Sequence, residues 1–416
     1  MPRSSVSKSL SVLALAIVMF CLRATSASAG EPECGDGADC AEQGSKCESS
    51  GDFLKAEGFF EKACRLENAL GCYKLGSLYW SDARIKRDVA KALPYMEQGC
   101  RLQHAEACMS LGDLYFTDEE FQDLPKAKTF NNKACRLGSG MGCVNLGYLY
   151  TMDLKDALVD EKMLILFEKG CNQGTGEGCN SLATIYEKGL NVPQDFKKAG
   201  AFYDRACSMD FALGCGNLSS LYYYGRGVEQ NYDTSIRLME KACELNNGLG
   251  CLGLGNMYDG MPGIPKDGAK AVMNYVKACS LKEIDGCVMA ALYYERGTGI
   301  PQDDAKAREC FEKACDLKNV VKSGKPCMSA GNYWLESRGA ERDYQKAGEY
   351  FEKGCHLGYT EACNKAGEMH EHGTGFPQDL KKARELYKKA CELGNDEGCA
   401  LSGKPAEKEN GKASAK

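Results

Sequence analysis

Cysteines recur along this chain in pairs with a nearly constant spacing. Nine pairs follow the pattern Cys-x7-Cys, a tenth is stretched by four residues, and successive pairs begin 35 to 40 residues apart. A period of this length predicts a solenoid of stacked units rather than a set of separate domains. The ten pairs are Cys64 with Cys72, Cys100 with Cys108, Cys135 with Cys143, Cys171 with Cys179, Cys207 with Cys215, Cys243 with Cys251, Cys279 with Cys287, Cys315 with Cys327, Cys355 with Cys363, and Cys391 with Cys399.

Each unit predicts two helices. In "DLKKARELYKKAC" (379–391), Asp379 is a good helix N-cap, Pro377 prevents an earlier start, and apolar residues then follow a 3.6-residue period. A second helix is expected to begin at the second cysteine, after a short turn that contains glycine. The expected fold is therefore all-α: a right-handed α-solenoid superhelix of about ten disulfide-stapled antiparallel helix pairs.

Small residues alternate with large ones at fixed places in this pattern. The fourth residue after the second cysteine is Gly, Ala or Ser, as at Gly76 and Gly255, whereas an aromatic residue or Met stands four before most first cysteines, as at Phe60 and Tyr203. Glycine inside a helix costs about 1 kcal/mol relative to alanine. Its recurrence predicts a close approach between helices.

The cysteine spacing admits a disulfide more readily than a metal or redox site. On one continuous helix the two cysteines would lie about 12 Å apart, too far for a bond, but on two antiparallel helices they face each other. Zinc and redox motifs use shorter spacings, so no metal and no cofactor are expected. Each disulfide closes a short loop and stabilises the fold by roughly 2.5 kcal/mol in the chain-entropy model.

Four further cysteines fall outside the repeat: Cys34, Cys40, Cys47 and Cys310. The pairing of these four stays open at this point. Cys40 with Cys47 is one candidate bond, which would staple an N-terminal cap, and Cys310, inside a helix, is a candidate free thiol.

The first 29 residues predict a secretory signal peptide. Arg3 and Lys8 precede a short apolar run, and Ala27-Ser28-Ala29 forms a cleavage site. We expect Cys21 to be removed with this segment and the mature protein to be periplasmic or secreted, in an oxidising compartment. The remaining expected divisions are a cap at 30–51, the repeats at 52–402 and a disordered polar tail at 403–416.

The net charge and hydropathy of the expected mature chain limit the classes of partner that it can bind. Loss of residues 1–29, with their three cations and no acid, changes the net charge from −6 to −9. An acidic chain is a poor ligand for nucleic acid or anionic membranes. No later stretch is apolar enough to span a membrane. We expect a monomer whose partner is a protein or peptide, including a cell-wall peptide.

The pattern "LGxLYxxGxGVxQDxxKAxxYFEKA" resembles the Sel-one-like repeat, a relative of the tetratricopeptide repeat. The paired cysteines resemble those of the Hcp group of cysteine-rich secreted bacterial proteins. This resemblance implies a scaffold that binds ligands through its concave face. Members of the Hcp group also carry the label of β-lactamase and penicillin-binding protein, which makes hydrolysis of β-lactams the alternative function.

The motifs of a β-lactamase are not visible in the expected mature chain. The Ser-x-x-Lys motif occurs only at Ser5–Lys8, and Lys-Thr-Gly and Ser-Asp-Asn are absent. His370 occupies a repeat position that usually holds tyrosine, and His104 and His356 fall near turns, where an exposed side chain is expected. Catalytic residues therefore stay unknown, and the scaffold is favoured.

The candidate ligand groove lies on the helices that begin with the second cysteine. By analogy with tetratricopeptide arrays, these helices are expected to line the inner curve. The eighth residue after each second cysteine varies, beginning aromatic and later turning acidic, which predicts a ligand with an apolar end and basic residues. The groove candidates are Trp80, Phe116, Tyr223, Asp259 and Glu295.

Overall fold

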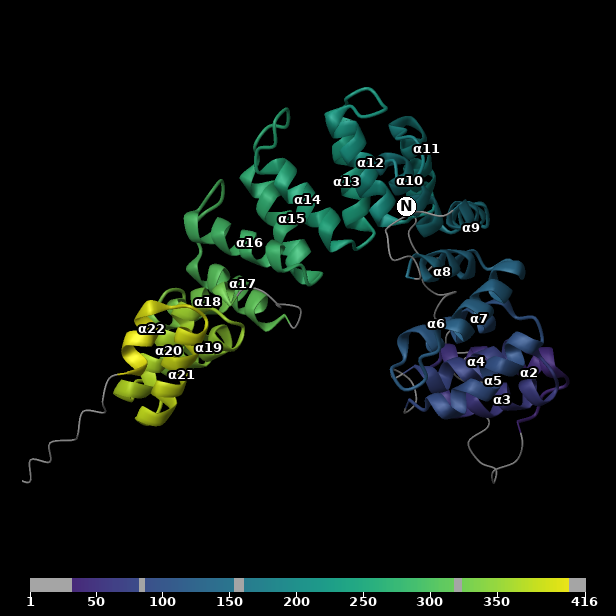
Figure 1. Cartoon of the computed structure of the whole chain (residues 1–416), viewed down its shortest axis with the longest axis horizontal. Coiled ribbons are helices and arrows are strands. Elements are labelled where there is room, and N and C mark those ends of the chain that lie inside the picture. Colours follow the sequence, from purple (N-terminus) through teal and green to yellow (C-terminus); the bar gives the residue numbers. More distant parts are fainter. Residues whose placement is uncertain (1–31, 82–86, 153–160, 318–323, 404–416) are drawn as a thin grey trace, which may run out of the picture. The chain divides into compact units, whose positions relative to one another are not determined.

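The computed structural model describes residues 32–81, 87–152, 161–317 and 324–403 (Figure 1). All regular secondary structure in these ranges is α-helical, as predicted. None of the helices in these ranges is long and apolar enough to cross a membrane. The signal peptide predicted at 1–29 and the tail beyond Gly403 lie outside the described residues.

The helices fall into two compact units, Met1–Met209 (unit 1) and Asp210–Lys416 (unit 2), each taken by itself below. Unit 1 contains α2 (Gly37–Ser49), α3 (Phe53–Arg65), α4 (Ala69–Trp80), α5 (Val89–Arg101), α6 (Ala105–Thr117), α7 (Leu124–Arg136), α8 (Gly140–Thr151), α9 (Glu161–Asn172), α10 (Gly176–Lys188) and α11 (Phe196–Ser208). Unit 2 contains α12 (Ala212–Tyr224), α13 (Tyr232–Glu244), α14 (Gly248–Tyr258), α15 (Gly268–Ser280), α16 (Ile284–Arg296), α17 (Asp304–Asp316), α18 (Lys325–Leu335), α19 (Tyr344–His356), α20 (Thr360–His372), α21 (Leu380–Glu392) and α22 (Asp396–Ser402).

Helix starts of the odd-numbered helices follow the predicted capping residues. Asp379 accepts a hydrogen bond from the backbone N of Lys382 at 2.9 Å, as expected of an N-cap. Other odd-numbered helices start in the same way, as at Asp195 before α11.

The even-numbered helices begin before the second cysteine, so the expected start at that cysteine is wrong. The reason is a second cap: the Asn68 side chain accepts from the backbone N of Gly71 at 2.8 Å and starts α4 at Ala69. Cys327 lies two residues after the first residue of α18. In the other repeats the second cysteine lies three residues after the helix start, at Cys72, Cys108, Cys143, Cys179, Cys215, Cys251, Cys287, Cys363 and Cys399.

The small residue at the fourth position packs against the large residue of the next odd-numbered helix. A Cβ added at Gly331 in α18 would lie 2.4 Å from Cε1 of Phe351 in α19, and one at Gly255 in α14 would lie 2.5 Å from Cε1 of Tyr275 in α15. These distances are below van der Waals contact, so only glycine fits. The predicted close approach of the helices is confirmed at these positions.

The same packing extends to the start of the described chain. A Cβ added at Gly44 in α2 would lie 2.6 Å from Cε1 of Phe60, as in the later repeats. Residues before position 52 therefore supply a helix that packs like the second helix of a repeat.

Disulfides join the two helices of each hairpin near the turn, and their Cα atoms lie 4.4–4.8 Å apart in nine of the predicted pairs. These nine bonds join Cys64 to Cys72, Cys100 to Cys108, Cys135 to Cys143, Cys171 to Cys179, Cys243 to Cys251, Cys279 to Cys287, Cys315 to Cys327, Cys355 to Cys363, and Cys391 to Cys399. Cys207 and Cys215 are also disulfide-bonded.

Small neighbours permit the close approach at these bonds. A Cβ added at Gly286, beside Cys287, would lie 2.6 Å from the Cβ of Ala278. A larger side chain at that glycine would push the two helices apart at the turn, where the cysteines must meet.

Candidate functional site

Cys40 bonds to Cys34, with Cα atoms 5.2 Å apart, rather than to Cys47. The candidate bond between Cys40 and Cys47 is not formed, because both residues lie on α2, seven positions apart. Seven residues of helix span about 10 Å, which exceeds the reach of a disulfide. Cys34 precedes the helix and can fold back onto it.

Cys310 is a free thiol, 7% exposed, inside α17. Burial raises the pKa of this thiol to about 11, so the thiolate is scarce at neutral pH. This environment suits a core residue and gives no support to redox chemistry at Cys310.

The aromatic groove candidates divide into two groups. Trp80 and Phe116 are half-buried and pack against the core of unit 1. Tyr223 is only 7% exposed and belongs to a core cluster with Met257 and Ile264. Placing Tyr223 in the groove is therefore wrong.

The segment after α14 explains the burial of Tyr223. The Tyr223 hydroxyl donates to the backbone O of Pro262 at 2.9 Å, and its ring lies 5.4 Å from that of Tyr232. The segment therefore covers the tyrosine. Tyr224, the next residue, is 55% exposed.

The acidic groove candidates bind tyrosine hydroxyls of the next repeat. Glu295 accepts from the hydroxyl of Tyr333 at 3.0 Å and from Nη1 of Arg338 at 3.0 Å. Asp259 accepts from the hydroxyl of Tyr293 and from Nζ of Lys266. Both carboxylates are thus engaged inside unit 2, which weakens the predicted negative end of the groove.

Hydrogen bonds outweigh desolvation at Asp259. Burial alone would raise the pKa of this carboxyl, but hydrogen bonds from Tyr293 and Lys266 hold it below its ordinary value. The side chain is therefore a stable carboxylate that links two repeats.

In unit 1, a different position connects the even-numbered helices. The residue five positions after the second cysteine of one unit forms a hydrogen bond with the residue two positions after the second cysteine of the next unit. Nδ2 of Asn145 on α8 donates to Oδ1 of Asp113 on α6 at 2.6 Å. The hydroxyl of Tyr148 on α8 lies 2.7 Å from Oγ of Ser181 on α10. These bonds define a surface made of α6, α8 and α10, hereafter the even layer of unit 1.

Asp113 is an electrostatically unusual member of this layer. Burial raises its pKa to about 6, and the hydrogen bond from Asn145 lowers it only in part. No cation among the described residues lowers the pKa of this carboxyl. A desolvated carboxyl without a counter-charge is a common mark of a binding or catalytic site.

Apolar rings flank Asp113 on the same layer. Phe116 follows it by three residues on α6, which places the two side chains on one helix face. Tyr148 follows Asn145 by three residues on α8 and is 39% exposed. The layer therefore carries, on neighbouring helices, a carboxyl and two partly accessible aromatic rings.

Asp113, Asn145 and Tyr148 are not among the predicted groove residues, because those residues all lie eight positions after a second cysteine. The residue five positions after each second cysteine varies from unit to unit, although the neighbouring fourth position always holds a small residue. In successive units this fifth residue is Ser77, Asp113, Tyr148 and Thr184. Unit-to-unit variation at that position marks the contact to the neighbouring even-numbered helix.

The histidines serve structural roles where they are buried. His370 is 7% exposed, its Nε2 lies 2.6 Å from Oε1 of Glu352, and its ring stacks on Phe376. His104 caps α6 and stacks on Tyr73, so its expected exposure is wrong, and burial lowers its pKa. No group of three metal-ligating side chains occurs among the described residues.

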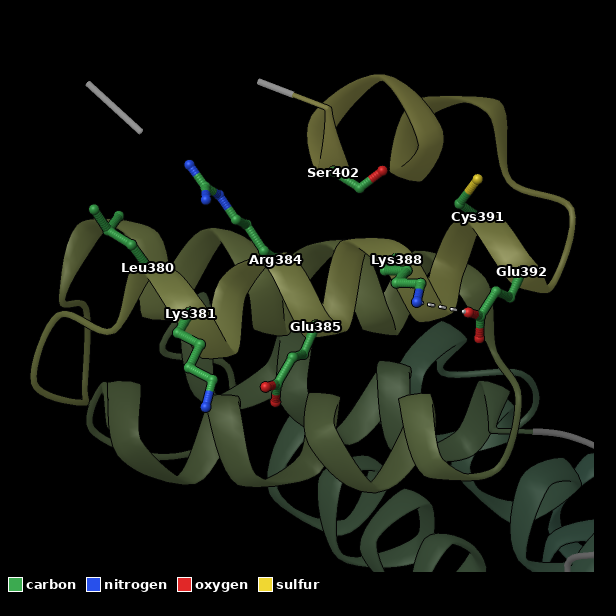
Figure 2. A pocket seen from close by; sticks show the side chains of 8 residues that line it. All are labelled: Leu380, Lys381, Arg384, Glu385, Lys388, Cys391, Glu392 and Ser402. Carbon is green, nitrogen blue, oxygen red and sulfur yellow. Dashed lines mark ion pairs between the residues drawn. The ribbon is translucent and has the colours of Figure 1, made fainter. Parts of the chain in front are cut away.

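A cavity of about 620 Å³ lies beside α21 and α22 (Figure 2). The same stripe on α19 is covered by the following repeat: a Cβ at Gly348 would lie 2.1 Å from Cε2 of Phe376. Arg384 occupies the equivalent place on α21, and Lys388 pairs with Glu392 at 3.6 Å.

The comparisons agree with this architecture. The model of the Sel1 repeat matches residues 36–68, 69–104, 105–139, 176–211, 212–247, 248–282, 284–319, 329–359 and 360–395. A protective antigen of uropathogenic Escherichia coli strains that displays an SLR fold is 20% identical, with 88% of this chain and 87% of that chain covered and a TM-score of 0.51. Helicobacter pylori cysteine rich protein B is 32% identical over 31% of this chain and 93% of that chain, with a TM-score of 0.27.

The comparison with curated proteins gave no match. The likeness to the Escherichia coli antigen concerns the fold alone. The repeat model, in contrast, matches nine segments that together cover well over half of the 416 residues. The segments follow pairs of an even-numbered helix and the next odd-numbered helix, such as α14 and α15 within 248–282, which pack through the recurrent glycine, and the disulfides link each such pair to its neighbours. The chain therefore belongs to the Sel1 repeat family.

Proposed function

We propose that this protein is an exported scaffold that binds a segment of another protein, or a cell-wall peptide, on the even layer of unit 1. The observation that carries the proposal is the pairing of a desolvated carboxyl, Asp113, with the 39% exposed ring of Tyr148. Membership of the Sel1 repeat family supports a scaffold role, because these repeats generally mediate protein interactions. The many disulfides support an oxidising compartment.

Site-specific photo-crosslinking tests the binding surface. A photoreactive benzoylphenylalanine replaces Thr117, an exposed residue at the end of α6, and the control replaces Asp204, an exposed residue on α11. We expect discrete cross-linked products from position 117 in the native envelope and none from position 204. Equal products at both positions, or none at position 117, would contradict binding on the even layer.

Turnover of a chromogenic cephalosporin serves as a second measurement. We expect none, because His370 is held by Glu352, no group of three metal-ligating side chains lies in the described part of the chain, and Ser-x-x-Lys occurs only at Ser5–Lys8. Turnover that a single substitution abolishes would replace the scaffold by the enzymatic function.

A further inference from the structure

Asp113 keeps unused acceptor capacity. Among the described groups, Asn145 alone donates to its carboxyl, through one bond of 2.6 Å. A carboxylate offers about four acceptor positions. The side chain therefore retains room for a donor that the chain itself does not supply.

The surrounding charge favours a cationic donor. The helices α6, α8 and α10 carry four acids and one cation: Glu106, Asp113, Glu177, Glu187 and Lys188. Two cations on neighbouring elements are engaged elsewhere, since Lys74 pairs with Glu48 at 2.9 Å and Arg87 with Asp118 at 2.7 Å. Lys126, Lys128 and Lys198 of the odd-numbered helices lie over the rings of Tyr115, Tyr150 and Tyr186. No described cation lowers the pKa of Asp113, so a positive ligand group is complementary to this carboxyl.

We infer that the even layer of unit 1 binds a protein segment that presents a lysine or arginine side chain to Asp113 and an apolar side chain to Tyr148 and Phe116. This inference rests on the proposed function and specifies its partner. The cation would replace the missing counter-charge, and the charge-assisted hydrogen bond would be stronger than a neutral one. The accessible face of Tyr148 can also interact with the bound cation.

The rings distinguish a protein segment from a cell-wall stem peptide. A stem peptide carries an amino group but no large apolar side chain. Tyr148 and the half-buried Phe116 would then keep their present exposure. A segment with an apolar residue next to its cation covers both the ring surface and the carboxyl, so it is the favoured occupant.

Peptide selection against the purified full chain tests the inference. A phage library of random 12-residue peptides is selected on the wild-type protein, on Asp113→Asn and on the matched control Asp204→Asn. We expect the wild-type and control pools to be enriched in Lys or Arg next to an aromatic or aliphatic residue. The Asp113→Asn pool should lose the cation preference, and a consensus peptide should bind this variant at least about tenfold more weakly.

The outcomes separate the inference from the proposed function. Binders that cross-link to position 117 but show no cation preference, or bind Asp113→Asn equally well, would overturn the inference and leave the scaffold intact. Absence of any binder on the even layer would overturn both. Displacement of the consensus peptide by a synthetic stem peptide at equal concentration would assign the site to cell-wall peptides instead.

Proton release gives an independent readout. Binding a cation lowers the pKa of the carboxyl that it contacts. Calorimetric titration of the consensus peptide at pH 6, in two buffers of different ionisation enthalpy, should show proton release with the wild type and none with Asp113→Asn. Equal proton release from both proteins would contradict contact with Asp113.

Discussion

Replacing Asp113 by asparagine should stabilise unit 1 at neutral pH. Burial raises the pKa of Asp113 to about 6, from an ordinary value of 3.8. Each pKa unit corresponds to about 1.4 kcal/mol, so the ionised carboxyl destabilises the fold by at most about 3 kcal/mol. Since the side chain is only half-buried, we expect a gain of about 1–2 kcal/mol in the free energy of unfolding.

The pH dependence follows from proton linkage. Between about pH 4 and pH 6 the folded state binds more protons at Asp113 than the unfolded state does, so wild-type stability falls as pH rises through this window. The asparagine of Asp113→Asn does not titrate, so the stability of the variant lacks this pH dependence. Its advantage should therefore be largest above pH 7 and should vanish near pH 4.

Urea unfolding followed by circular dichroism, with disulfides intact, measures the difference between variant and wild type at pH 4 and pH 7.5. Asp204→Asn, on the exposed face of α11, should show no pH-dependent difference. The reasoning fails if Asp113→Asn is destabilised at pH 7.5, or if its gain is the same at both pH values.

Three further predictions concern packing and cysteine chemistry. Gly331→Ala should lower the free energy of unfolding by about 1–3 kcal/mol, because its Cβ would lie 2.4 Å from Cε1 of Phe351. Gly216→Ala has no atom within 4 Å of its Cβ and should raise the free energy of unfolding by about 0.5–1 kcal/mol; urea midpoints that move in the same direction for both variants would contradict this. Cys310, with its pKa raised to about 11 by burial, should resist iodoacetamide at pH 8 until urea is added, and rapid labelling of the native protein would refute its burial. Replacing Cys355 and Cys363 together by alanine should lower the hydrogen-exchange protection of the α19 and α20 amides by about 2–3 kcal/mol, measured against α15 and α16 as internal reference. Unchanged protection would show that the disulfide does not stabilise this hairpin.

Periodicity made the helix pairs predictable because each unit repeats one packing solution. The glycine that contacts Tyr275 or Phe351 recurs at the same place in the pattern, so one observation applies along the chain. The cysteine pairs follow from the same argument, since a turn between antiparallel helices brings both residues together. This argument did not predict the Cys34–Cys40 disulfide, because its sequence separation of six residues departs from the spacing of the repeat.

The residues of the candidate site could not be predicted in the same way, because they differ between units and the repeat pattern says nothing about their environment. The row at the eighth position combined side chains with unlike environments: Tyr223 is covered by the segment that follows α14, whereas Phe116 stays half-buried on α6. Whether Tyr223 is exposed depends on Pro262, thirty-nine residues away. A local pattern cannot show such a contact.

The acids show the same limit in electrostatic terms. Asp113 lies within the even-numbered helix α6 and Asp259 directly follows the even-numbered helix α14. The pKa of Asp113 is nevertheless raised, whereas that of Asp259 is lowered. The difference comes from their partners: Asn145 supplies one bond to Asp113, while Tyr293 and Lys266 both bind Asp259. A carboxylate therefore keeps unused acceptor positions where the neighbouring repeat supplies few donors. If the proposed function holds, the donor set of the adjacent unit, rather than the acid itself, is the feature that locates the binding site.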